Sequence, residues 1–133
     1  SALGDYGNAQ NVKVIGKFLK DPAVIVRVAA AESLGKLNNP SAVELLSAAL
    51  DDDSNTYRGN SLWVRSHFVL ALGNIGSSAA YPTLLRCLSD GDERVVQSAV
   101  HALEMIAGFS LGDGRTPEQE IEAWSRWIQN QIQ

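Results

Sequence analysis

Residues 21–35 read DPAVIVRVAAAESLG, and the end of this stretch, Ser33-Leu34-Gly35, decides the fold because it recurs along the chain. The matching triplets are Ala2-Leu3-Gly4, Ala71-Leu72-Gly73 and Ala102-Leu103-Glu104, so their leucines lie 31, 38 and 31 residues apart. A second apolar series, Leu19, Leu50 and Leu88, has the same intervals of 31 and 38 residues. Two independent series therefore indicate a 31-residue unit with one 7-residue insertion, a period typical of stacked-repeat proteins.

The insertion lies between Leu50 and Trp63, because the spacing of the apolar series lengthens only there. Residues 51–62 read DDDSNTYRGNSL, and their Asp, Ser, Asn and Gly content favours turns over continued helix. The sequence therefore predicts an inserted loop at one end of the second complete unit.

Apolar residues inside each unit recur at helical spacing, and no segment alternates as a strand would. They are Val12, Ile15 and Leu19, then Val43, Leu46 and Leu50, then Val64, Phe68, Leu72 and Ile75. Each unit is predicted to form two short antiparallel helices, A and B, that bury their apolar faces by stacking on neighbouring units. The predicted fold is an all-α solenoid in one domain: the end of a truncated repeat at 1–8, repeats at 9–38, 39–76 (with the loop at 51–62) and 77–108, and a capping helix at 116–133.

Residues 21–35 resemble the D-P-x-x-x-V-R-x-x-A-A-x-x-L-G unit of the short HEAT-like repeats of bacteria and archaea, the type found in phycobilin lyase subunits. The string Trp63-Val64-Arg65 repeats part of the unit, whereas the third copy has Val96 where arginine is expected. The resemblance implies that the B helices line a concave contact surface. It also implies that turn aspartates pair with the arginines, here Asp21 with Arg27 and Asp52 with Arg65.

The two ends of the chain depart from the regular unit. Thr116-Pro117-Glu118-Gln119 has the pattern of a capping box, and Ile121, Trp124, Trp127 and Ile128 follow it with helical spacing, as expected of a terminal cap. Residues 1–6 align with the end of a B helix, so we expect the sequence to start inside a repeat. Leu3, Tyr6, Val12 and Ile15 would then lack a neighbour, and the open N-terminal repeat could self-associate.

Composition argues against several functions. The formal charge is −4 and the pI is near 5.0, so nucleic acid and membrane are not expected partners. A single cysteine, Cys87, which the register places against the core, and two unaligned histidines predict no metal site. The string Gly108-Phe109-Ser110-Leu111-Gly112 fits G-x-S-x-G but lacks the strand-to-helix context and a following histidine. The sequence therefore predicts no catalytic residue, no cofactor and no enzyme; it leaves the compartment open, with the cytoplasm favoured.

Candidate contact residues come from the exposed side of the B helices and from the inserted loop. The helical wheel places Ser66, Leu70 and Gly73 opposite the core, and Gln97 and His101 are the equivalents of the first two. Tyr57, Arg58 and Trp63 lie at the loop, and aromatic residues and arginine are enriched in binding hot spots.

Three functional interpretations follow. The first is a non-catalytic interaction module that binds another protein or peptide through Tyr57, Arg58, Trp63, Ser66, Leu70, Gln97 and His101. The second is an accessory subunit or domain of an enzyme such as a bilin lyase, and the third is a structural spacer in a longer solenoid. Asp51-x-Asp53-x-Asn55 resembles the start of a calcium loop, but Thr56 and Leu62 stand where that loop needs Gly and Glu, so calcium binding stays open.

Overall fold

The computed structural model describes the backbone of residues 2–133 and the side chains of residues 9–133. The helices are α1 (Ala2–Gly16), α2 (Val24–Leu37), α3 (Ala42–Leu50), α4 (Val64–Ile75), α5 (Tyr81–Cys87), α6 (Glu93–Ala107) and α7 (Pro117–Ile132), with 3-10 turns at Lys17–Lys20 (η1), Asp53–Asn55 (η2) and Ser78–Ala80 (η3). The strands β1 (Thr56–Tyr57) and β2 (Asn60–Ser61) form one antiparallel hairpin. No described helix has the length and apolar character needed to cross a membrane.

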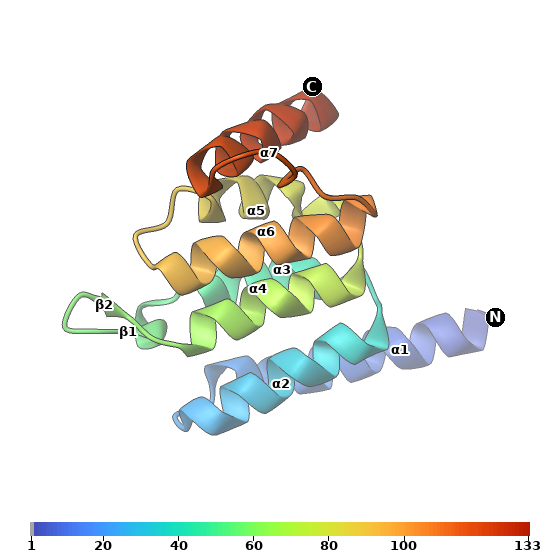
Figure 1. Ribbon diagram of the computed structural model, residues 1–133. Coiled ribbons are helices and arrows are strands. Elements are labelled where there is room, and N and C mark those ends of the chain that lie inside the picture. The colour runs from blue at the N-terminus through green and yellow to red at the C-terminus, as the bar shows by residue number, and fades with distance from the viewer. Residues whose placement is uncertain (1) are drawn as a thin grey trace.

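The helices form two layers, as the repeat predicted. Helices α2, α4 and α6 lie side by side in one layer, and α1, α3 and α5 form the layer behind it (Figure 1). We call α2, α4 and α6 the B helices. Helix α7 packs on α5 at the end of the stack. The all-α solenoid of helix pairs with a C-terminal cap is thus confirmed.

Left-handed residues end all three B helices. Asn38 has φ 53°, Gly76 has φ 75° and Gly108 has φ 85°, each at the C-cap. This conformation ends a helix while keeping its last carbonyl groups bonded, and glycine adopts it at little cost. Because the same type of C-cap recurs in each unit, the three B helices end at equivalent positions of the repeat.

The B helices approach closely at one glycine per helix. A Cβ atom on Gly73 would lie 2.8 Å from the Cα atom of Ala102 in α6, and one on Gly35 would lie 3.4 Å from the Cα atom of Ala71 in α4. Gly73 is therefore buried between two helices and does not belong to the exposed face where the helical wheel placed it. The helical wheel located the core side of the helix correctly. It could not show that neighbouring B helices also cover both flanks of α4.

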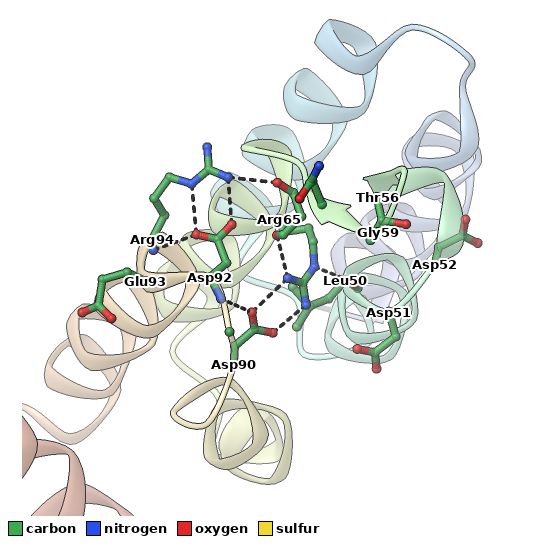
Figure 2. A pocket seen from close by; sticks show the side chains of 13 residues that line it. Leu50, Asp51, Asp52, Thr56, Gly59, Arg65, Asp90, Asp92, Glu93 and Arg94 are labelled. Carbon is green, nitrogen blue, oxygen red and sulfur yellow. Dashed lines mark hydrogen bonds and ion pairs between the residues drawn. The ribbon is translucent and has the colours of Figure 1, made fainter.

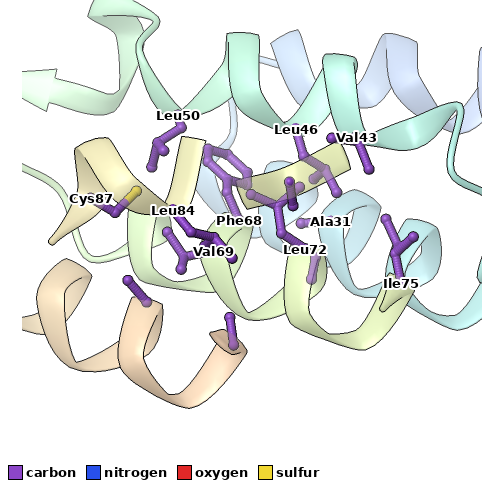
Figure 3. Packing of buried hydrophobic residues seen from close by; sticks show 14 of the residues in the cluster. Ala31, Val43, Leu46, Leu50, Phe68, Val69, Leu72, Ile75, Leu84 and Cys87 are labelled. Carbon is purple, nitrogen blue, oxygen red and sulfur yellow. The ribbon is translucent and has the colours of Figure 1, made fainter. Parts of the chain in front are cut away.

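The main core lies between the two layers. Leu46, Phe68, Leu72 and Leu84 are fully buried there, together with Cys87 (Figure 3). Burial raises the pKa of the Cys87 thiol to about 12, so it remains protonated and packs as a small apolar side chain.

The two repeat arginines bind the turn of the following unit, and neither forms the expected ion pair with the carboxylate of Asp21 or Asp52. Arg27 Nε donates to Asn55 Oδ1 at 3.0 Å, while the Asp21 carboxylate accepts from the backbone N–H of Ala23. Arg65 pairs with Asp90 at 2.7 Å and not with Asp52, which accepts from the N–H of Ser54. Each arginine also donates to the segment before its own helix, Arg27 to the Asp21 carbonyl at 2.7 Å and Arg65 to Ser61 Oγ at 2.7 Å. Each arginine therefore links that segment to the turn of the next unit.

Asn55 anchors the insertion. Its side chain is fully buried, and its Nδ2 donates to the Ala49 carbonyl at 2.7 Å while its Oδ1 accepts from Arg27. The backbone carbonyl of Asn55 accepts from Leu62 N at 3.0 Å, which closes the base of the loop. The inserted segment is thus fixed to the first B helix.

The C-terminal helix covers the last unit with aromatic side chains. Trp124 and Ile128 are fully buried, and Trp124 stacks on Phe109 with ring centroids 5.5 Å apart. Trp127 forms T-shaped pairs with Tyr81 and Trp124, with ring centroids 5.3 Å and 5.5 Å apart, respectively. Thr116 and Gln119 form the expected capping box at the start of α7.

We expect Gly73→Ala to destabilise the protein. Its Cβ would clash with the backbone of α6, and separating packed helices costs about 1–3 kcal/mol. Gly91→Ala is the matched control, because its Cβ would meet no atom within 4 Å. Urea unfolding of both variants measures the difference, and equal midpoints would contradict the close contact.

We expect Asn55→Ala to lower the free energy of unfolding by about 1–3 kcal/mol, because Arg27 and the Ala49 carbonyl would lose a buried partner. The control is Asn60→Ala on the exposed hairpin strand. Chemical denaturation followed by circular dichroism checks both. If the two variants unfold at the same midpoint, Asn55 is not the anchor of the loop.

Candidate functional site

The inserted segment contains a tight hairpin at one end of the B layer. Thr56 pairs with Ser61 and Tyr57 with Asn60, and the two turn residues, Arg58 and Gly59, both have positive φ, at 52° and 80°. This is the backbone of a two-residue hairpin turn with two left-handed residues. Tyr57 is 62% exposed, and the Arg58 guanidinium lies 5.3 Å from the centre of its ring. The loop thus presents an aromatic ring and a cation at its tip.

An open groove of about 660 Å³ separates this hairpin from the turn that precedes α6 (Figure 2). Its walls carry five carboxylates and two guanidinium groups. The carboxylates are Asp51, Asp52, Asp90, Asp92 and Glu93, and the guanidinium groups are Arg65 and Arg94.

Both arginines of the groove are held by oxygen acceptors of the protein. Arg65 donates to the Leu50 carbonyl, to Ser61 Oγ and to both oxygens of Asp90. These bonds lower the pKa of Asp90 and raise that of Arg65. Arg94 binds Asp92 at 2.8 Å, which holds the pKa of Asp92 well below its usual range, and also donates to the Ser61 carbonyl.

The charge of the groove favours donors over anions. Because the guanidinium groups are already bound, the excess of carboxylates determines the local field. The groove is therefore better suited to N–H groups or cations of a partner than to a phosphate or a carboxylate.

The exposed side of the B helices forms a second surface, which we call the B face. Trp63 is 42% exposed at the start of α4, and its ring forms a T-shaped pair with that of His67, with ring centroids 5.3 Å apart. Leu70, one turn beyond His67, is half-buried and not fully open to water. Ser66 donates through Oγ to the Trp63 carbonyl at 2.8 Å. These residues lie together on α4.

The candidate residues on α6 and on the hairpin are spread more widely. His101 is exposed at the position equivalent to Leu70. Gln97 lines a separate small cavity of about 160 Å³ with Arg115 and Pro117, where α6 faces the start of α7. Tyr57 and Arg58 lie on the hairpin, which extends beyond the end of α4 (Figure 1).

Two features of the B face escaped the sequence reasoning. His67 Nδ1 lies 3.9 Å from Glu32 Oε1 on the neighbouring helix α2. Ile25 is 66% exposed at the start of α2, at the position that Trp63 occupies on α4. The repeat register contained this signal, because Ile25 and Trp63 each precede a repeat arginine by two residues.

No group of three or more His, Cys, Asp or Glu side chains that could hold a metal occurs among the residues described. In the calcium-like run, Asp51 pairs with Arg86 at 2.8 Å and the Asn55 amide is used as described above. In the string at 108–112, Ser110 Oγ accepts from the Gly112 N–H within a loop after α6.

Similar proteins include enzymes and enzyme subunits. The chain is 33% identical over 90 residues to phycocyanobilin lyase subunit alpha from Nostoc sp., covering 66% of this chain and 33% of that protein. It is 32% identical over 95 residues to deoxyhypusine hydroxylase from Aspergillus clavatus, covering 71% and 27%, respectively. The chain therefore spans about a third of the length of the curated relatives it matches.

Solved structures show the same fold. Human deoxyhypusine hydroxylase aligns with a TM-score of 0.68 and 25% identity, covering 99% of this chain and 49% of that one. A chain of the complex of CpcE and CpcF of phycocyanin lyase from Nostoc sp. aligns with a TM-score of 0.65 and 24% identity, covering 88% and 52%.

These relatives contradict the prediction that the chain is not an enzyme, and they agree with the alternative of an enzyme subunit or domain. Deoxyhypusine hydroxylase is an enzyme, and the Nostoc protein is a subunit of a lyase. The prediction from missing motifs was wrong because a site that draws its residues from several repeats need not be complete in one segment.

The family itself is clear from the repeats. The family model for HEAT repeats matches residues 1–63 and 58–118, which together cover most of the sequence. The helix pairs, the forward-reaching arginines and the glycine contacts recur at the same register. The chain is a member of the HEAT repeat family.

Proposed function

We propose that this chain is the HEAT-repeat part of an enzyme or enzyme subunit, and that its B face and hairpin hold a protein partner there. The enzymatic context rests on the relatives, which are a lyase subunit and a hydroxylase. The protein partner agrees with the first of these, whose name makes it one subunit of a larger enzyme.

The observation that carries the contact surface is a pair of exposed apolar side chains at equivalent positions. Ile25 and Trp63 begin neighbouring B helices and are 66% and 42% exposed, and the hairpin with Tyr57 extends from the same end of the layer. Large exposed apolar groups bordered by polar residues are typical of protein contacts, and Trp, Tyr and Arg dominate their binding energy.

The surroundings of these residues suit a partner with positive charge. Glu32 lies beside His67 on the B face, and the acidic groove adjoins the hairpin. Charge complementarity of this kind speeds association and aligns the partner. We therefore propose a partner surface with apolar anchors and a basic border.

The double variant Ile25→Ser with Trp63→Ala tests this surface. We expect partner affinity to fall at least tenfold, about 1.4 kcal/mol, because two exposed anchors are removed at little cost to folding. Ile132→Ser on α7 is the matched control, since Ile132 is also exposed, at 48%.

The measurement is affinity capture from an extract of the source organism, followed by mass spectrometry and titration of the captured protein. A protein held by wild type and control but lost from the double variant supports the surface. Equal recovery with wild type, control and double variant would show that the contact does not involve Ile25 and Trp63.

The lyase relative motivates a separate test with its pigment. If the chain belongs to a lyase of this type, added phycocyanobilin, a linear tetrapyrrole, will shift its visible absorption on binding and quench the tryptophan fluorescence in proportion. Heat-unfolded protein serves as the control. An unchanged spectrum at saturating pigment would reject the lyase context and favour the one suggested by the hydroxylases.

A further inference from the structure

A small cavity lies between α6 and the start of α7, apart from the acidic groove beside the hairpin. The segment 108–116 leaves the end of α6 and runs back toward the first half of that helix, where α7 begins (Figure 1). These elements enclose about 160 Å³, which we call the α6–α7 cavity. Its apolar lining consists of Val96, Val100, Pro117 and Ile121, and its polar lining of Gln97, Arg115 and Glu120.

The floor of the cavity lies at the third copy of the repeat arginine. Val96 is equivalent to Arg27 and Arg65, whose side chains extend from their helices to acceptors of the next unit. The side chain of Val96 is much shorter, and it is buried at 4% exposure. The space beside α6 therefore stays open and has an apolar floor.

Two opposite charges border this cavity without pairing with each other. The Arg115 guanidinium donates to the Leu111 carbonyl at 2.8 Å, but it forms no ion pair with a carboxylate among the described residues. Glu120 is half-buried, and its carboxylate accepts no hydrogen bond from the described part of the chain. The cavity thus offers one cation and one anion beside an apolar floor.

We propose that the α6–α7 cavity binds a free α-amino acid with an apolar side chain of leucine size. The ligand carboxylate pairs with Arg115, and the ligand ammonium group pairs with Glu120. The apolar side chain packs on the floor at Val96 and Val100. Hydrogen bonds between ionised groups are about twice as strong as neutral ones. A cavity of roughly 150 Å³ holds a benzene-sized group, so the volume is sufficient for a four-carbon side chain.

Ligands with a single charge match this lining less well. A carboxylate or phosphate alone would face the negative charge of Glu120, and an amine alone would face the positive charge of Arg115. A peptide carries its ammonium and carboxylate groups on different residues. A free amino acid presents both groups on one carbon atom, next to its side chain, and therefore satisfies both charges of the cavity at once.

This cavity is distinct from the surface that the sequence predicted for self-association, which was formed by Leu3, Tyr6, Val12 and Ile15. Helix α1 runs without a break from Ala2 to Gly16, past the helix end expected near residue 8, and Val12 is only 2% exposed. The side chains of Leu3 and Tyr6 lie outside the described residues.

Titration of the ¹⁵N-labelled chain with L-leucine, followed by NMR, tests the proposal. We expect saturable shifts concentrated in the backbone amides of residues 96–100 and 111–121. Arg115→Gln and Glu120→Gln should each weaken leucine binding at least tenfold, because each removes one of the two charge pairs.

Three further variants separate the cavity from its surroundings. Val100→Phe should abolish leucine binding, because the larger ring fills the floor and leaves both charges in place. Glu122→Gln and Arg126→Gln are the matched controls, since these residues lie on the same helix, pair with each other and do not line the cavity. Both controls should bind leucine as the wild type does, and circular dichroism checks that every variant is folded.

Three related ligands test the zwitterion itself. Leucinamide lacks the carboxylate, 4-methylpentanoate lacks the ammonium group, and glycine lacks the side chain, so each should bind at least tenfold more weakly than leucine. The proposal is overturned if leucine causes no saturable shifts in wild type, or if its affinity survives Arg115→Gln, Glu120→Gln or Val100→Phe. Equal binding of leucine and leucinamide would also overturn it, and would indicate a site for the amino terminus of a peptide.

Discussion

The close approach of the B helices at Gly35 and Gly73 sets the arrangement of the whole stack. A glycine lets two helix backbones come nearer than any side chain would allow, so α2, α4 and α6 form one tight layer. Helices α1, α3 and α5 then pack behind that layer through larger residues such as Leu46 and Leu84. In the last unit Glu104 replaces the glycine, and here α7 packs on α5 instead of forming a fourth B helix.

The arginines fix the orientation of each unit relative to the next. Arg27 and Arg65 are held by several acceptors each, and part of each set belongs to the following unit. A buried arginine without such partners would be costly, and Val96, which stands at the third position, is buried at 4% exposure. Valine therefore suits a unit followed by α7, where no equivalent turn accepts the guanidinium group.

Periodicity predicted the fold well because it depends on local spacing. The core positions Leu46, Phe68 and Leu84 all follow from it. It could not predict the flank contacts of Gly73 or the partner of Arg65, since both depend on how neighbouring units are set side by side. The hairpin also escaped prediction, because Arg58 occupies a left-handed turn position that Asn or Gly usually fills.

Function was harder to predict from the sequence than the fold, because the functional residues of a repeat protein can be spread over several units. Each unit contacts only its neighbours, so residues that act together on a substrate can come from several units. A segment about a third as long as its curated relatives can thus lack every complete catalytic motif and still belong to an enzyme. The informative residues in such a segment are those that break the equivalence between units, such as the exposed Ile25 and Trp63 beside the inserted hairpin. Both side chains remain largely open to a partner on the same scaffold, and function resides in such residues and not in the fold that HEAT proteins share.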